Sequence, residues 1–89
     1  MEKKEVLKKL NNQYFKSLKR FEKIYSALPG FKAELKKFNK GYLKVISAVL
    51  TGDADKIRVS LYHNFFYICA TDNEKDELRI LIDSVPTNH

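Results

Sequence analysis

The sequence contains little of what disulfide-stabilised, metal-binding or catalytic proteins of its size use. It holds one cysteine, two histidines, three glycines and no tryptophan among 89 residues. A single cysteine cannot build an internal disulfide framework, and its isolation fits a reducing compartment. No stretch approaches the roughly twenty apolar residues that span a bilayer, and no signal-peptide core follows the first lysines. We therefore expect a cytoplasmic protein.

The few residues with reactive side chains form no recognisable catalytic or metal-binding arrangement. His63 has no nucleophile or further ligand at the usual spacing. Cys69 lies in the apolar run 65–70, where a buried, unreactive thiol is expected. The acidic run 72–77 lacks the glycine that a calcium loop needs at its sixth position. The three glycines are scattered and form no phosphate loop. The sequence thus predicts no enzyme, no metal and no cofactor.

Charge is distributed very unevenly along the chain. Residues 1–50 carry thirteen Lys and Arg against four Glu, a net charge of +9, whereas residues 51–89 carry four against seven, a net charge of −3. The overall charge of +6 therefore joins a basic half to a mildly acidic half. A concentrated positive field attracts polyanions and acidic surfaces. This asymmetry is the main indication of partners that the sequence offers.

The basic half predicts two amphipathic helices. Apolar residues in 2–28 recur every three or four positions, which is typical of one helical face: Leu7, Leu10, Tyr14, Leu18, Phe21, Ile24, Tyr25 and Leu28. Pro29 and Gly30 end this helix, and a second periodic run covers 31–50. A tight connection between two such helices predicts an antiparallel hairpin. Gly41 indicates a kink, or a split of the second helix at 39–41.

The acidic half is less uniform. Gly52 suits a helix end and Asp53 the N-cap of the next helix. Residues 56–70 favour a third helix, with a β-hairpin turning near 63–64 as the alternative. Thr71 and Glu74 have capping-box spacing before a last helix, which Pro86 is expected to stop.

Together these segments predict one all-α domain over 1–89, a small antiparallel four-helix bundle built on the long N-terminal hairpin. The alternative is an α+β fold with a hairpin in 56–70.

The candidate binding residues lie opposite the apolar faces of the first two helices. They are Lys8, Phe15, Lys16, Lys19, Arg20, Lys23, Lys36, Lys37 and Lys44. Fourteen lysines against three arginines favour point-charge contacts to phosphates or acidic side chains over bidentate base recognition. Phe15 lies beside Lys8 and Lys19, where an aromatic ring can stack on a base or anchor a partner protein. The alternative readings are a plain solvated face and a Phe15 packed under a later helix.

The sequence leads to three functional hypotheses. The first is a small non-enzymatic regulator or inhibitor that binds nucleic acid or an acidic protein surface. In composition alone, it is similar to the small lysine-rich proteins that are common among phage and mobile-element accessory factors. The second is a protein acting at the inner membrane face, because size, charge and expected build are similar in outline to bacteriocin immunity proteins. No sequence motif carries that similarity. The third is a helical assembly protein or homodimer, paired through the heptad-spaced residues Leu7, Tyr14, Phe21 and Leu28.

Overall fold

The computed structural model describes residues 2–85 and is helical throughout, with no strand among these residues. The helices are α1 (Lys3–Tyr25), α2 (Phe31–Thr51), α3 (Ala54–Tyr62), α4 (Phe65–Ile68) and α5 (Asp72–Asp83). The predicted all-α bundle is confirmed, and the alternative β-hairpin in 56–70 is wrong. The expected stop at Pro86 lies outside the described residues.

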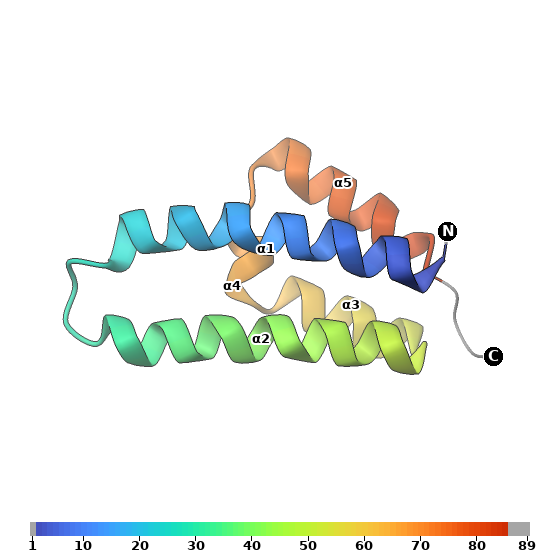
Figure 1. Ribbon diagram of the computed structural model, residues 1–89, viewed down its shortest axis with the longest axis horizontal. Coiled ribbons are helices and arrows are strands. Elements are labelled where there is room, and N and C mark those ends of the chain that lie inside the picture. The colour runs from blue at the N-terminus through green and yellow to red at the C-terminus, as the bar shows by residue number, and fades with distance from the viewer. Residues whose placement is uncertain (1, 86–89) are drawn as a thin grey trace.

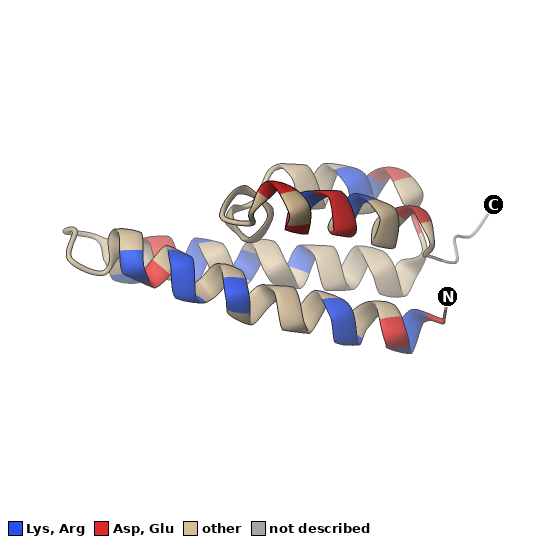
Figure 2. Cartoon of the chain, turned by 90° about the horizontal axis from the view of Figure 1, so that it is seen from above, with Lys and Arg blue, Asp and Glu red and all other residues tan. Residues whose placement is uncertain are grey.

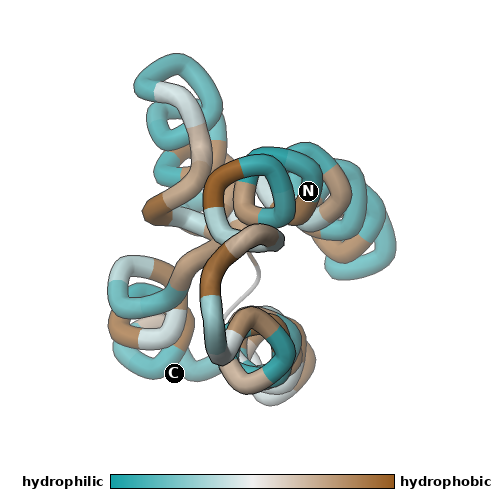
Figure 3. Tube along the Cα trace, turned by 90° about the vertical axis from the view of Figure 1, so that its left-hand side faces the viewer, coloured by the Kyte–Doolittle hydropathy of each residue, from teal (hydrophilic) through white to brown (hydrophobic). Residues whose placement is uncertain are grey.

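The helices form two layers. α1 and α2 run antiparallel in one layer, and α3 and α5 lie behind them in the other (Figure 1). Viewed along the long axis, the helices of the two layers lie side by side (Figure 3), and the single turn of α4 contacts α1, α2 and α3. The molecule measures 44 × 23 × 18 Å, and its closed hairpin end extends beyond the second layer (Figure 1). The hairpin is therefore the longest continuous surface of the protein.

The turn between α1 and α2 follows the predicted break. Gly30 adopts a left-handed φ of 82°, which glycine accepts without a Cβ clash. The amide of Phe31 donates to the carbonyl of Leu28 at 3.3 Å and closes the turn. Because α1 ends at Tyr25, the helix predicted to reach Leu28 was three residues too long.

Gly41 does not split α2, as the sequence suggested it could, because the helix is continuous from Phe31 to Thr51, and α2 runs without a sharp bend (Figure 1). A Cβ added at Gly41 would lie 2.7 Å from the Cβ of Asn64, a separation too short for two carbon atoms. The Asn64 side-chain amide donates to the Gly41 carbonyl at 3.3 Å. Glycine at this position therefore lets the segment between α3 and α4 approach α2 closely.

Asn64 also explains why residues 56–70 form neither one helix nor a hairpin. Its side-chain oxygen accepts a hydrogen bond from the Phe66 amide at 3.0 Å and caps α4. Asparagine at an N-cap competes with helix continuation because its short side chain binds the free backbone donors. The third helix predicted from the sequence is thus divided into α3 and α4 at His63 and Asn64.

The buried face of α1 is rotated from the predicted stripe. Gln13 and Ser17 are buried beside Leu10 and Phe21, whereas Ile24 is 61% exposed. α1 packs on α2 through the Phe21 and Phe38 rings, 5.0 Å apart, and on α4 through Ser17, which donates to the Phe66 carbonyl at 2.6 Å. Because α2 and α4 contact α1 from two different directions, the buried face of α1 lies between these directions. The protein's own core therefore buries three residues of this face, Leu10, Ser17 and Phe21.

Candidate functional site

The basic hairpin, residues 3–51, carries the lysines of the first layer. Figure 2 shows Lys and Arg distributed over α1 and α2, and Asp and Glu concentrated on α5. Two hairpin lysines have polar partners: Lys37 pairs with Glu34 at 3.3 Å, and Lys3 donates to the Leu50 carbonyl at 3.1 Å. The remaining lysines of the hairpin are exposed and have no ion-pair partner among residues 2–85. They are Lys4, Lys8, Lys9, Lys16, Lys19, Lys23, Lys32, Lys36, Lys40 and Lys44.

The second layer uses its arginines differently. Arg58 of α3 pairs with Asp83 of α5 at 3.4 Å, and Arg79 pairs with Asp76 within α5. Arg79 also donates to the Tyr67 hydroxyl at 2.7 Å. These pairs neutralise part of the second layer internally. Most of the unpaired positive charge of the described residues therefore lies on the basic hairpin, since Lys56 and Lys75 are the lysines of the second layer without an ion pair among residues 2–85.

Arg20 is the predicted binding residue whose structural role is clearest. Its guanidinium forms a two-pronged ion pair with Glu74, with 2.9 Å between Nη2 and Oε2, and also donates to the Cys69 carbonyl at 3.3 Å. The hydrogen bond from Arg20 lowers the pKa of Glu74 to about 2, against the opposing effect of burial. Arg20 joins α1 to α5 and is not one of the unpaired cations.

Phe15 lies on the outer surface of α1 and is 53% exposed, so it is not packed under a later helix. Its ring meets the ring of Tyr14 edge to face, with centroids 5.3 Å apart and planes at 69°. Tyr14 is itself fixed, because its hydroxyl donates to Asn39 and its ring lies 4.3 Å from that of Tyr42. An exposed aromatic ring thus rests on an ordered aromatic support.

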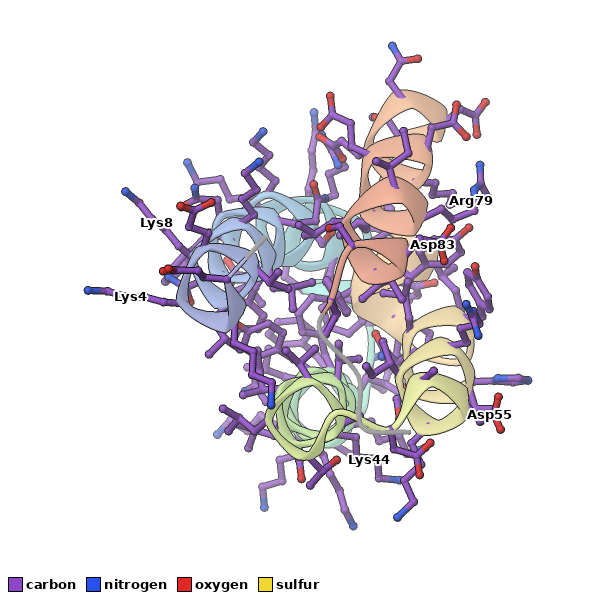
Figure 4. All side chains as sticks on the ribbon, turned by 90° about the vertical axis from the view of Figure 1, so that its right-hand side faces the viewer. Lys4, Lys8, Lys44, Asp55, Arg79 and Asp83 are labelled. Atoms are coloured by element: carbon purple, nitrogen blue, oxygen red, sulfur yellow. The ribbon has the colours of Figure 1, made fainter. Side chains whose placement is uncertain are left out.

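The lysines nearest Phe15 share its side of α1. At 100° per residue, Lys8 and Lys19 lie within about 40° of Phe15 around the helix. The rise of 1.5 Å per residue places Lys8 about 10 Å before Phe15 and Lys19 about 6 Å after it. Figure 4 shows Lys4 and Lys8 projecting outward from α1, away from α5. We call Lys4, Lys8, Phe15, Lys19 and the acid Glu22, which follows Lys19, the Phe15 face.

The other predicted residues are distributed around the hairpin. Lys16 and Lys23 lie on the side of α1 next to the Phe15 face, turned towards α5. Lys44 projects from α2 on the side away from α1 (Figure 4). The structure therefore brings Lys8, Phe15 and Lys19 onto one face, but does not gather all the predicted lysines there.

A groove between α1 and α5 was not predicted from the sequence. Its volume is about 520 Å³, with Lys9 and Lys16 on the α1 wall and Glu77 on the α5 wall, above Leu78 and Leu81. Both signs of charge line it, so it favours no simple anion or cation. Its position depends on the pairing of α1 with α5, which local periodicity does not specify.

Comparisons with known proteins give no independent indication of function. No family model matches this chain, and no curated protein or solved structure matches it either. Within residues 2–85, no three His, Cys, Asp or Glu side chains come together in a way that would hold a metal ion. None of the described helices has both the length and the apolar content needed to cross a membrane. Function must therefore be inferred from the chain's own residues.

Proposed function

We propose that this protein is a small non-enzymatic regulator that binds nucleic acid through its basic hairpin, in the cytoplasm. The observation that carries the proposal is the set of exposed lysines on α1 and α2 that have no ion-pair partner among the described residues. Unpaired ammonium groups are suited to phosphate oxygens, which they contact as point charges without reading sequence. Binding would release the counterions condensed on the nucleic acid, which supplies the driving force.

The lysine array fits a nucleic-acid backbone better than an acidic protein surface. From Lys4 to Lys23 the charges extend over about 28 Å of helix, a stretch that contains two acids, Glu5 and Glu22. A nucleic acid presents regularly spaced phosphates over such a length, whereas lysine is depleted in the buried centres of protein interfaces. At physiological salt, charges separated by more than about 8 Å are largely screened, so these lysines act through close contacts.

The proposal is tested by fluorescence anisotropy of labelled RNA, single-stranded DNA and duplex DNA at several salt concentrations. We expect saturable binding whose logarithmic affinity falls linearly with the logarithm of salt, by about 0.7 to 0.9 for each phosphate contacted. Replacing Lys8 and Lys19 with glutamate should weaken binding by at least about tenfold.

The matched control replaces Lys56 and Lys75, in the second layer, with glutamate and changes the net charge equally. It should reduce affinity by less than about threefold, because the lost charges lie outside the hairpin. Equal losses in the two double variants would show that only total charge matters. Absence of binding to all three nucleic acids at low salt would exclude the proposed function.

A second candidate function is contact with an anionic membrane surface, and one specific observation favours it. Ile24 and Leu28, at the closed end of the hairpin, are 61% and 53% exposed, with the exposed residues Lys23 and Lys32 close by in the sequence. Apolar side chains beside lysines bind the boundary of acidic lipid bilayers. Vesicle flotation tests this candidate: wild type should float with anionic vesicles, and a variant with serine at positions 24 and 28 should not. Equal flotation of both proteins would exclude it.

A further inference from the structure

We infer that the nucleic acid bound by the hairpin is single-stranded and that one of its bases stacks on Phe15. This inference rests on the proposed function and names the substrate class of the same surface. It starts from an apolar ring that is 53% exposed on the most basic helix of the protein. Lys8 and Lys19 lie on either side of this ring, and an aromatic ring between cations is the arrangement that base-stacking platforms use.

The support beneath Phe15 is already in place before a ligand arrives. An edge-to-face contact occupies at most one face of the Phe15 ring, so the contact with Tyr14 leaves the other available. Tyr14 is held by Asn39 and Tyr42, both in α2, and burial raises the pKa of its hydroxyl. The ring is thereby carried by both helices of the hairpin, which limits the entropy lost on stacking.

The lysines of the Phe15 face lie where the phosphates next to a stacked nucleotide would be. Lys19 and Lys8 flank the ring on opposite sides along the helix, at about 6 and 10 Å. Glu22, one further turn beyond Lys19, repels phosphate on that side. The strand is therefore expected to run from Phe15 toward the start of α1, over Lys8 and Lys4.

A duplex does not fit this arrangement as well as a single strand. In a duplex the bases are stacked on one another and paired, so a surface ring meets sugars, phosphates and base edges but not the flat faces of the internal bases. A single strand exposes the flat faces of its bases, and each base that stacks on an aromatic side chain strengthens binding about 5- to 150-fold. The Phe15 ring thus contributes to affinity for single strands and not for duplexes.

The test uses the absence of tryptophan from the chain. The variant Phe15→Trp provides a single indole reporter at the proposed platform, and Tyr62→Trp, at a 40% exposed position in α3, provides the matched control. Titration with a twelve-nucleotide deoxythymidine strand should quench the indole at position 15 and leave the one at position 62 unchanged. A twelve-base-pair duplex at saturation should quench neither.

The variant Phe15→Ala completes the test. It should lose about tenfold in affinity for the single strand and less than about twofold for the duplex, with an unchanged melting temperature because the side chain is exposed. Salt-dependent binding without quenching at position 15, or equal losses for both nucleic acids, would overturn the inference while leaving the proposed function standing. If the wild-type protein bound no nucleic acid at all, both the inference and the proposed function would be excluded.

Discussion

Arg20 of α1 and Glu74 of α5 form a two-pronged ion pair, with 2.9 Å between Nη2 and Oε2, that fastens the last helix to the first. The same carboxylate accepts a hydrogen bond from the Thr71 amide at 3.0 Å and completes the capping box of α5. Gln13 donates to it as well, at 3.0 Å. One side chain therefore couples the start of α5 to its attachment on α1.

The first prediction concerns acid stability. The pKa of Glu74 is about 2 in the folded protein, whereas an unfolded glutamate has a pKa of about 4.3. A lowered folded pKa gives stability that is complete above the unfolded value and is lost as pH falls from about 4.3 towards 2. We expect Glu74→Gln to lower the free energy of unfolding at pH 6 by about 2 kcal/mol, allowing for screening at half-exposed Arg20. Chemical denaturation at pH 6 and pH 3 measures this.

The control for this prediction is Glu77→Gln in the same helix, an exposed position that takes part in no ion pair among residues 2–85. The difference between wild type and Glu74→Gln should shrink at pH 3, whereas Glu77→Gln should remain close to wild type at both pH values. A difference for Glu74→Gln that is as large at pH 3 as at pH 6 would contradict the ionic role of Glu74.

The second prediction concerns Gly41. In most helices, replacing glycine with alanine stabilises by up to about 1 kcal/mol. Here the added Cβ would lie 2.7 Å from the Cβ of Asn64, whose side chain is fixed by hydrogen bonds to Gly41, Ser60 and Phe66. We expect Gly41→Ala to destabilise the fold by about 1 to 3 kcal/mol, measured by urea denaturation.

The comparison for Gly41 is Ala33→Gly, at an exposed position of the same helix. It should follow ordinary helix propensity and cost about 1 kcal/mol. A Gly41→Ala protein more stable than wild type would show that α2 and the segment before α4 do not approach as described.

The third prediction concerns the polar residues buried in α1. Ser17 is fully buried, donates to the Phe66 carbonyl at 2.6 Å and accepts from the Gln13 amide at 3.0 Å. Ser17→Ala would leave both partners without this hydrogen bond and should cost about 1 to 3 kcal/mol in urea denaturation. The exposed Ser47→Ala is the control and should change stability by less than about 0.5 kcal/mol. Equal stability of the two variants would contradict the buried contact.

Local features of the fold were predictable because their causes are local. The capping box of Thr71 and Glu74 and the N-cap at Asp53 involve residues three apart, and both are confirmed. The helix end at Gly52 is likewise confirmed, with a left-handed φ of 72°, whereas Gly30 is left-handed but precedes α2, because α1 already ends at Tyr25. Each depends on a backbone preference that sequence displays directly.

Other features depended on partners far away in the chain. Arg20 had the pattern of a surface cation, yet it pairs with Glu74, which lies 54 residues further along. Gly41 had the sequence pattern of a helix defect, but its lack of a side chain makes room for Asn64, which packs against it. For the candidate site, the sequence supplied the lysines and Phe15, whereas only the three-dimensional arrangement separated the unpaired cations from Arg20. The groove between α1 and α5 had no local indication at all.

The measurement that most directly tests the basic hairpin as the binding surface is an amide chemical-shift map of the ¹⁵N-labelled protein, titrated with a twelve-nucleotide single strand at low salt. The largest shifts are expected in α1 around Phe15 and Lys19 and on the outer side of α2, with little change in α3 and α5. Shifts concentrated in α3, in α5 or in the groove beside Lys9, or no shifts at saturating nucleic acid, would contradict this assignment.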